Sequence, residues 1–387
     1  MPDLERLHAL FQANFAERNE CGAAVSVWKH GEEVASFAGG HADREGERPW
    51  THDTLVPVWS VTKGAAAIAT LVALVEAGLS PRERVSRIWP ELRAAASSRL
   101  TFLQLLSHQA GLAALSPENR PHLLDHAGVC RALERQEPFW EPGRSHGYHP
   151  RTYGFLLDEI TRRCNGGESL GSYWRTRIAQ PLDLDFWIGS LSLDALERVA
   201  TVIPPRVQLP PDDEWEFYRA LGDTESLSHG AFSSPSGLRA ISEINKPEIL
   251  QAGLPALGGV ASARALAKFY QVLIAGDEWE GRRVIPSQVF LYLRDVHACG
   301  HDLTLRLPTA YTAGFMMDPH DDSGEKVRRL FGPSARAFGQ PGAGGSHAFA
   351  DPEHGMSFAY VMNRMESGIL PNRKSLDLLD AIYRIAD

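Results

Sequence analysis

Large apolar side chains recur along this chain with two different spacings, and the strand-like spacing is clearest near the two ends. Apolar, β-prone runs on both sides of His30–Glu32 predict a β-hairpin over residues 23–38. Large apolar residues occupy every second position from Met356 to Met362. Residues 346–364 therefore predict two strands joined at Asp351–Gly355.

Helical spacing predominates in the rest of the chain. Residues 62–77 are rich in Ala, Leu and Val and predict a helix that is apolar almost all round, and hence buried. Amphipathic helices are predicted over residues 4–15 and over Lys374–Ile385. Residues 80–200 carry mainly helical signals. Residues 203–257 are rich in Pro, Gly, Ser and acidic residues without sustained periodicity, and we expect long ordered loops there.

This order of elements predicts an α+β fold. Strands from both termini would join in one antiparallel sheet flanked by helices, with the helical middle as an insertion beside it. We expect a sheet domain built from residues 1–80 and 196–387, and an inserted, mainly helical domain over residues 81–195.

Composition excludes several classes of function. The chain has 387 residues, 43% hydrophobic, and a net charge of −9 without any basic run, so nucleic acid is not an expected partner. No apolar run approaches the roughly 20 residues needed to span a bilayer, and no membrane association is expected. The first residues lack the pattern of a secretory signal, which predicts a cytoplasmic protein. The oligomeric state is left open.

Neither the cysteines nor the histidines form a metal-binding pattern. Four scattered cysteines, without any C-x-x-C spacing, are expected to be free. His122 and His126 do not match a pattern such as H-E-x-x-H. We therefore expect no metal and no cofactor.

The candidate chemistry begins with Ser-x-x-Lys, which is a weak motif by itself. Only six lysines occur in the chain, and three of them follow a serine by three positions. The pairs are Ser26/Lys29, Ser60/Lys63 and Ser323/Lys326. The first lies in a predicted strand, where residues three apart point to opposite faces. The third lies in a polar, acidic turn, where the lysine is expected to be solvated near its ordinary pKa of about 10.4.

Ser60 and Lys63 differ because they open the apolar helix. Residues three apart share a helix face. Burial would lower the pKa of Lys63 toward that of a usable base, and the helix dipole favours negative charge near Ser60. The alternative is that Ser60 only caps the helix while Lys63 extends its ammonium group into solvent.

Three segments, in the same order, resemble the serine β-lactamase-like superfamily. "PVWSVTKGAAAIATLVALVEAG" (57–78) resembles its nucleophile helix, and "WEPGRSHGYHPRTYGFLLDEI" (140–160) resembles its Pro-Gly…Tyr-x-Asn segment. "FGQPGAGGSHAFADPE" (338–353) resembles its Lys/His-Thr-Gly strand. The resemblance runs from about residue 20 to the C-terminus. It is strongest to class C β-lactamases, penicillin-binding-protein-like peptidases and, above all, family VIII carboxylesterases.

The resemblance implies a set of roles and the β-lactamase/transpeptidase type of fold. Ser60 would be the nucleophile, and Lys63 and Tyr148 would share the general-base and general-acid work, with the first base left open. A nearby ammonium group or helix dipole would lower the pKa of Tyr148 from about 10. The backbone N–H groups of Ser60 and Ala343 would form the oxyanion hole. The residues expected to contact substrate or allow its close approach are Gln340, Gly342, Gly344, Gly345 and His149.

Departures from the family pattern redirect the expected substrate. Pro150 stands where the family has an amide side chain, and Gln340 stands where it has a cation that would hold a carboxylate. Pro341 replaces a hydroxyl residue, whereas the pair Tyr148-His149 is similar to that of related esterases. These changes favour a neutral, short-chain carboxylic ester as the small-molecule substrate.

Other functions stay open at this point. β-Lactamase, D-amino-acid peptidase or transesterase activity would use the same chemistry, and a non-catalytic binding protein would use the same fold. Gly167–Gly171 matches G-x-S-x-G, but that nucleophile turn needs a hydrophobic strand before it, and here a polar helix end precedes Ser169. We expect Ser169 to begin the next helix.

Overall fold

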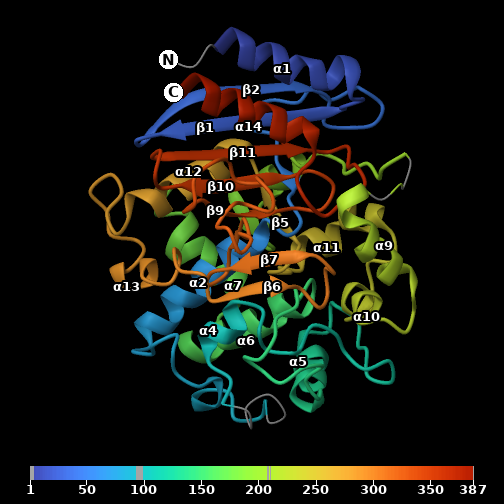
Figure 1. Cartoon of the computed structure of the whole chain (residues 1–387), viewed down its shortest axis with the longest axis vertical. Coiled ribbons are helices and arrows are strands. Elements are labelled where there is room, and N and C mark those ends of the chain that lie inside the picture. Colours follow the sequence, from blue (N-terminus) through green and yellow to red (C-terminus); the bar gives the residue numbers. More distant parts are fainter. Residues whose placement is uncertain (1–3, 93–98, 207–208, 210, 387) are drawn as a thin grey trace.

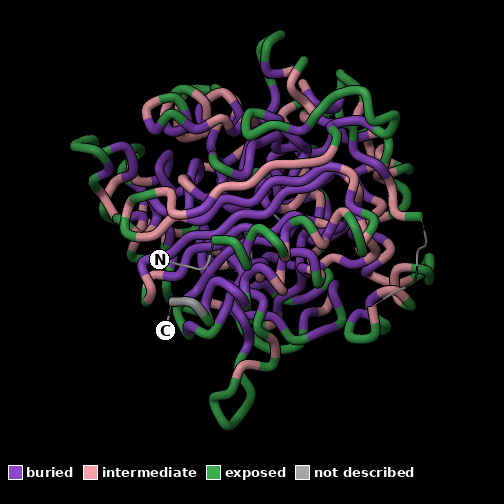
Figure 2. Tube along the Cα trace, turned by 90° about the horizontal axis from the view of Figure 1, so that it is seen from above, coloured by how far each residue is buried: buried purple, intermediate pink, exposed green. Residues whose placement is uncertain are grey.

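A large antiparallel sheet is the centre of the computed structural model, which describes residues 4–92, 99–206, 209 and 211–386 (Figure 1). The strand order is β2-β1-β11-β10-β9-β8-β7-β6. The strands are β1 (Gly22–Lys29), β2 (Glu32–Gly40), β6 (Ala298–His301), β7 (Pro308–Tyr311), β8 (Met316–Met317), β9 (Phe338–Pro341), β10 (His347–Asp351) and β11 (Met356–Met362). Figure 2 shows that the central strands of this sheet are buried. The predicted α+β class and the pairing of strands from both termini are confirmed, since β1 pairs with β11.

Helices cover both faces of this sheet. On one face, α1 (Leu4–Glu17) and α14 (Arg373–Ala386) lie side by side (Figure 1). The Asn14 amide of α1 donates to the Tyr360 hydroxyl of β11 (3.4 Å). On the other face lies α12 (Ala263–Ala275), where the carbonyl of Ala267 accepts from the Ser357 hydroxyl (2.7 Å). Tyr360 and Ser357 are three residues apart on β11 and therefore point to opposite faces.

The remaining helices lie mainly beside and below the sheet (Figure 1). The α-helices are α2 (Thr62–Glu76), α4 (Phe102–Leu106), α5 (His126–Arg135), α6 (Thr152–Asn165), α7 (Leu170–Trp174), α8 (Leu193–Glu197), α9 (Trp215–Gly222), α10 (Leu227–Ser233), α11 (Pro247–Gln251) and α13 (Ser287–Phe290). The short helical turns are η1 (Val85–Arg87), η2 (Arg175–Ala179), η3 (Asp212–Glu214) and η4 (Ile241–Asn245). Helix α2 is buried from Thr62 to Leu74, as its apolar sequence predicts.

The expectation of loops over residues 203–257 is wrong in part, because α9, α10, α11 and two short turns lie there. These helices have five to eight residues, which is too short for a helical period to stand out in the sequence. Local capping supports them instead: the Ser226 hydroxyl accepts from the backbone N–H of His229 at the start of α10.

A small sheet joins the segments around the candidate nucleophile. Its order is β3-β5-β4, from β3 (Val56–Pro57), β5 (Gly259–Ala261) and β4 (Phe186–Ile188). The chain leaves β3 and reaches Ser60 three residues later, just before α2. The pairing of β3 with β5 therefore holds the start of α2 against the segment that precedes α12.

The cysteines agree with expectation, since all four are free. Among the described residues, no helix is long and apolar enough to cross a membrane.

Candidate active site

Ser60 and Lys63 come together where α2 begins. Lys63 Nζ lies 3.2 Å from Ser60 Oγ. Ser60 does not cap the helix: the N-cap position is Val61, and no side chain caps it. Trp59, the residue before the serine, has a φ of 50°, in the left-handed region that a bulky side chain rarely adopts. Such local strain is concentrated at functional sites, where the surrounding structure imposes it.

Lys63 is completely buried and has no carboxylate partner among the described residues. Its Nζ donates to the carbonyl oxygens of Pro150 (3.0 Å) and Ala256 (2.7 Å). It also lies 4.7 Å from the centroid of the Tyr148 ring. Burial lowers the pKa of Lys63 well below its ordinary value. The alternative of a solvent-exposed lysine is therefore wrong, and the buried amino group of Lys63 lies beside the serine hydroxyl.

Tyr148 contacts the same pair from the other side. Its side chain is 5% exposed, and Gln340 Nε2 donates to its hydroxyl oxygen (3.3 Å). Burial raises its pKa above the ordinary value of 10, the charge of Asp302 raises it further, and a hydrogen bond with Ser60 offsets this only in part. The expected lowering of the pKa of Tyr148 is wrong, because the effect of burial is the largest and raises it. Tyr148 is a protonated phenol in this site.

Asp302 holds the Tyr148 segment, and the sequence analysis missed it. Its buried carboxylate accepts from the backbone N–H of Tyr148, at 3.0 Å to each oxygen, and from the Tyr311 hydroxyl (3.0 Å). The same carboxylate accepts from the backbone N–H groups of Thr304 (2.9 Å) and Leu305 (2.7 Å). The only sequence signal was an aspartate followed two residues later by threonine, which is typical of an Asx turn.

A small cavity opens beside Ser60 and Tyr148. The space open to water in it is about 30 Å³, and its walls are mainly apolar. The lining residues are Ser60, Tyr148, Phe232, Leu305, Met316, Gln340, Pro341, Ala343, Ile369 and Leu370. Four of these residues carry predicted roles, namely Ser60, Tyr148, Gln340 and Ala343. The structure therefore brings the candidate nucleophile, the candidate proton shuttle Tyr148 and the third motif to one cavity.

The glycine-rich end of β9 lies against the nucleophile segment. The N–H of Gly342 donates to the carbonyl of Ser346 (2.7 Å), and the N–H of Gly344 donates to that of Gly368 (3.1 Å). The N–H of Ala343 comes between those of Gly342 and Gly344 along the chain, and Ala343 is the residue of the segment 342–345 that lines the cavity. A Cβ at Gly342 would lie 2.4 Å from the carbonyl oxygen of Val58, so only glycine permits this close approach.

His149 does not reach the cavity. Its Nδ1 lies 2.7 Å from the carbonyl oxygen of Gly147, and its Nε2 accepts from the backbone N–H of Leu112 (3.1 Å). Burial lowers its pKa to about 3, so the ring is neutral with both nitrogens bonded to the backbone. This arrangement shapes the loop around Tyr148 and leaves no ring nitrogen for a substrate.

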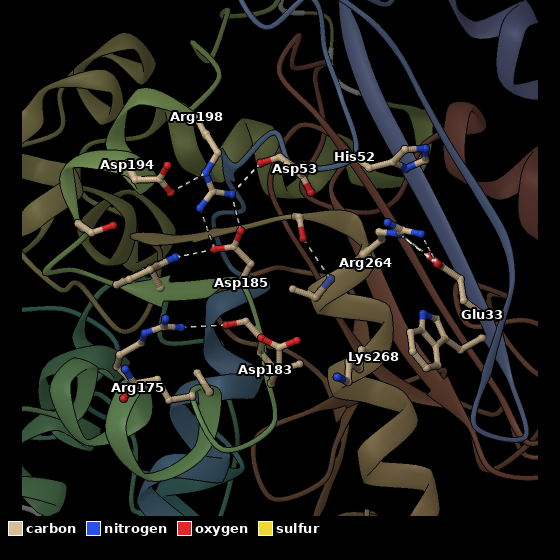
Figure 3. Close-up of a pocket in the computed structure, with 18 residues that line it drawn as sticks. Glu33, His52, Asp53, Arg175, Asp183, Asp185, Asp194, Arg198, Arg264 and Lys268 are labelled. Atoms are coloured by element: carbon tan, nitrogen blue, oxygen red, sulfur yellow. Dashed lines mark hydrogen bonds and ion pairs between the residues drawn. The ribbon is translucent and has the colours of Figure 1, made fainter. Parts of the chain in front are cut away.

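A larger cleft of about 610 Å³ lies elsewhere on the molecule, between β1, η2 and the start of α12 (Figure 3). Several of its charged side chains pair with one another: Arg198 pairs with Asp185 and Asp194, and Arg264 with Glu33. Both serines of this cleft are occupied as helix caps. Ser192 Oγ accepts from the N–H of Ala195, and Ser262 Oγ from that of Ala265. No activated nucleophile is present among its lining residues.

Ser169, in the G-x-S-x-G match, is also a helix cap. Its Oγ accepts from the N–H of Ser172 at the start of α7, and α6 rather than a strand precedes it. The expectation that Ser169 begins a helix is confirmed.

One group of residues has donor atoms close enough to suggest a metal: His126 and Cys130 on α5, with Glu159 on α6. Cys130 Sγ lies 3.8 Å from His126 Nδ1 and 3.7 Å from Nε2. His126 Nε2 is also paired with Asp158 (2.8 Å). His126 is therefore already engaged with a carboxylate of α6, and we assign no metal to this group.

Comparison with known proteins gives a consistent result. The sequence model of the Beta-lactamase family matches residues 7–381. The Esterase/beta-lactamase LipL of Mycobacterium tuberculosis is 31% identical over 363 residues, which are 93% of this chain and 81% of LipL. A penicillin-binding protein homologue from Caulobacter crescentus superposes with a TM-score of 0.84 at 34% identity, covering 99% of this chain and 98% of that one.

A family VIII carboxylesterase superposes with a TM-score of 0.83 at 31% identity, covering 100% of this chain and 98% of the esterase. The relatives thus include proteins named as esterases and proteins of the penicillin-binding type, and the resemblance seen in the sequence motifs is confirmed. The chain belongs to the Beta-lactamase family.

Proposed function

We propose that this protein is a serine hydrolase that cleaves short-chain carboxylic esters through an acyl-enzyme on Ser60. The observation that carries the proposal is a buried lysine without a counter-charge, 3.2 Å from a serine hydroxyl that lines a cavity. Serine hydroxyls become effective nucleophiles only beside a base of suitable pKa. No cofactor enters this chemistry.

The pKa directions support Lys63, rather than Tyr148, as the first base. Lys63 as a neutral amine takes the proton of Ser60 while Oγ attacks the ester carbonyl carbon. The negative charge that develops on the carbonyl oxygen is stabilised by the N–H groups of Ser60 and Ala343. Tyr148, a protonated phenol, gives its proton to the leaving alkoxide and recovers one from the Lys63 ammonium group.

The second half of the reaction returns the protein to its starting state. Water attacks the acyl carbonyl, and its proton passes to Lys63. The bond between Ser60 Oγ and the acyl carbon breaks, and Oγ takes back a proton from the Lys63–Tyr148 pair. The products are a carboxylic acid and an alcohol, and Lys63 is again neutral.

The cavity favours neutral esters. Gln340 is buried and donates to Tyr148, so it supplies no positive charge for a substrate carboxylate. Pro150 offers only its carbonyl, and that oxygen already accepts from Lys63. The other walls are mainly apolar side chains, which suit a short acyl chain.

Hydrolysis of p-nitrophenyl acetate and butyrate tests the proposal. We expect turnover by the wild-type protein, and a loss of at least about 10³-fold in Ser60→Ala, since residual catalysis from the oxyanion hole is small. Intact-mass analysis should detect one acyl group, mapped to Ser60. Equal turnover by the wild type and by Ser60→Ala would refute the proposal.

β-Lactam hydrolysis is the second candidate, because LipL carries both activities in its name. Nitrocefin turnover in the same assay separates the two candidates. The missing cation at Gln340 predicts a kcat/KM for nitrocefin well below that for p-nitrophenyl butyrate. A comparable value would make β-lactams the preferred substrate.

A further inference from the structure

A second buried carboxylate holds part of the wall of the Ser60 cavity. Glu214, 2% exposed at the start of α9, accepts from the backbone N–H of Ile369 (2.9 Å to Oε2) and of Leu370 (3.1 Å to Oε1). One turn later on the same helix, the Tyr218 hydroxyl accepts from the N–H of Gly368 (2.8 Å). Three successive backbone amides of the segment 366–370 are thus bonded to α9.

The same segment contacts the reacting end of the cavity. Ile369 and Leu370 line it. The carbonyl of Gly368 accepts from the N–H of Gly344 (3.1 Å), and the carbonyl of Gly344 accepts from the N–H of Glu366 (3.0 Å). Gly344 directly follows Ala343. The segment 366–370 therefore connects α9 to the backbone that would hold the oxyanion.

The contacts along this connection leave little room for movement. Gly368 has a φ of 120°, and a Cβ there would lie 3.3 Å from Glu214 Oε1. A Cβ at Gly344 would lie 2.6 Å from the Cβ of Met365. The ring of Phe217 on α9 packs against that of Phe232, another cavity residue, with centroids 5.1 Å apart. A shift of α9 would therefore move the wall and the segment together.

We propose that Glu214 is a positioning residue, which fixes the segment 366–370 and through it both the apolar wall of the acyl pocket and the Ala343 amide. This inference rests on the proposed ester hydrolysis. A buried carboxylate is costly unless hydrogen bonds satisfy it, and here backbone amides do so. Burial, and to a smaller extent the charge of Asp213, raise its pKa to about 7 against the opposing effects of the bonds from Ile369 and Leu370 and the charge of Arg328. At pH 8 the carboxylate is ionised and accepts both bonds.

The test measures the selectivity between acyl chains at pH 8. The variants are Glu214→Ala, Glu214→Gln and Tyr218→Phe, with Glu216→Ala as the control because Glu216 is exposed on the same helix. Active sites are counted from the burst of p-nitrophenol. In Glu214→Ala, we expect kcat/KM for the acetate ester to fall by about 10- to 100-fold per active site, as small misplacements at reacting groups do.

The ratio of butyrate to acetate turnover should rise in Glu214→Ala by roughly three- to tenfold, because a relaxed wall admits a longer chain. Glu214→Gln, which keeps one acceptor oxygen, should restore most of the acetate rate. Tyr218→Phe should change the ratio in the same direction but less. A merely structural role would lower the number of active sites and leave this ratio unchanged.

An unchanged ratio per active site in Glu214→Ala would overturn the inference. If Glu214→Ala does not fold, an unchanged ratio in both Glu214→Gln and Tyr218→Phe would overturn it. These outcomes differ from failure of the proposed function, in which the wild-type protein itself turns over no ester above Ser60→Ala.

Discussion

Two Ser-x-x-Lys pairs in this chain have buried lysines but different surroundings. Lys63 has no exposed surface, and its Nζ donates to two carbonyl oxygens and lies 3.2 Å from Ser60 Oγ, with no carboxylate partner among the described residues. The side chain of Lys326 is only 7% exposed, and its Nζ lies 2.9 Å from a carboxylate oxygen of Asp318, which is 1% exposed. Ser323 donates instead to Asp321 (2.6 Å).

The comparison shows that burial alone does not make a lysine a base. Where a buried carboxylate balances the ammonium group, the charged form is retained and the pair is structural. Where only neutral groups surround it, the neutral amine is favoured and can take a proton. The expectation that Lys326 is solvated is wrong, but its exclusion as a base stands for this different reason.

Replacing Lys63 should give the largest effect on activity. Lys63→Met removes the base, and we expect kcat/KM for p-nitrophenyl acetate to fall by about 10²- to 10⁴-fold, the usual contribution of a positioned base. Lys63→Arg is the matched control, because a guanidinium group stays charged and cannot accept the proton. It should be as inactive as Lys63→Met.

The pH dependence of the wild-type protein tests the same point. In the proposed mechanism the active form of Lys63 is neutral, so activity is present above its folded-state pKa and is lost as the pH falls through that value. Because the pKa is lowered, this loss should occur well below pH 10. At an ordinary pKa of about 10.4, only about 0.04% of the lysine would be neutral at pH 7. An acidic limb centred near pH 10 would contradict the assignment of the base.

Replacing Lys326 should affect stability instead. Lys326→Met leaves Asp318 buried and without its cation, which typically costs about 3–5 kcal/mol in the free energy of unfolding. Urea denaturation measures this, and turnover per active site should be unchanged. Adding Asp318→Asn to Lys326→Met should recover part of the loss. The structural role of the pair would be contradicted if Lys63→Met lost more stability than Lys326→Met.

Tyr148→Phe should show whether Tyr148 acts as an acid or as a base, because only an acid role depends on the leaving group of the ester. For an alkyl ester, whose alkoxide must be protonated, we expect a loss of about 10²-fold. For p-nitrophenyl acetate, whose leaving group is stable as an anion, the loss should be less than about tenfold. Equal losses for both esters would indicate that Tyr148 acts before the leaving group departs, as a base.

The sequence predicts the fold where its elements are long, and the site where its motifs are local. The alternating runs at 23–38 and 346–364 predicted the strand pairs β1–β2 and β10–β11. Strands β6, β7 and β8 have only two to four residues, which is too short to show an alternating pattern. The order of the three motifs predicted that Ser60, Lys63 and Tyr148 belong to one site, and in the structure they lie close together.

The supporting carboxylates were not predictable in this way. Asp302 and Glu214 bind backbone amides 154 and 155 residues away in sequence, and backbone amides leave no trace in side-chain patterns. The direction of the pKa of Tyr148 was missed for a related reason. It depends on its burial, on its hydrogen bond with Ser60 and on the charge of Asp302, all of which are properties of the assembled site.

Ser169→Ala should give the smallest effect on activity. It tests whether the G-x-S-x-G motif contributes to catalysis when no strand precedes it. The Ser169 hydroxyl accepts from the N–H of Ser172, and removing such a cap typically costs about 1 kcal/mol. Activity per active site should stay within about twofold of the wild type, because Ser169 has no base beside it and lies outside the lining of the Ser60 cavity. Thermal denaturation and p-nitrophenyl acetate hydrolysis measure the two quantities. A large loss of turnover with unchanged stability would move the nucleophile from Ser60 to Ser169, and would mean that G-x-S-x-G works here without a preceding strand.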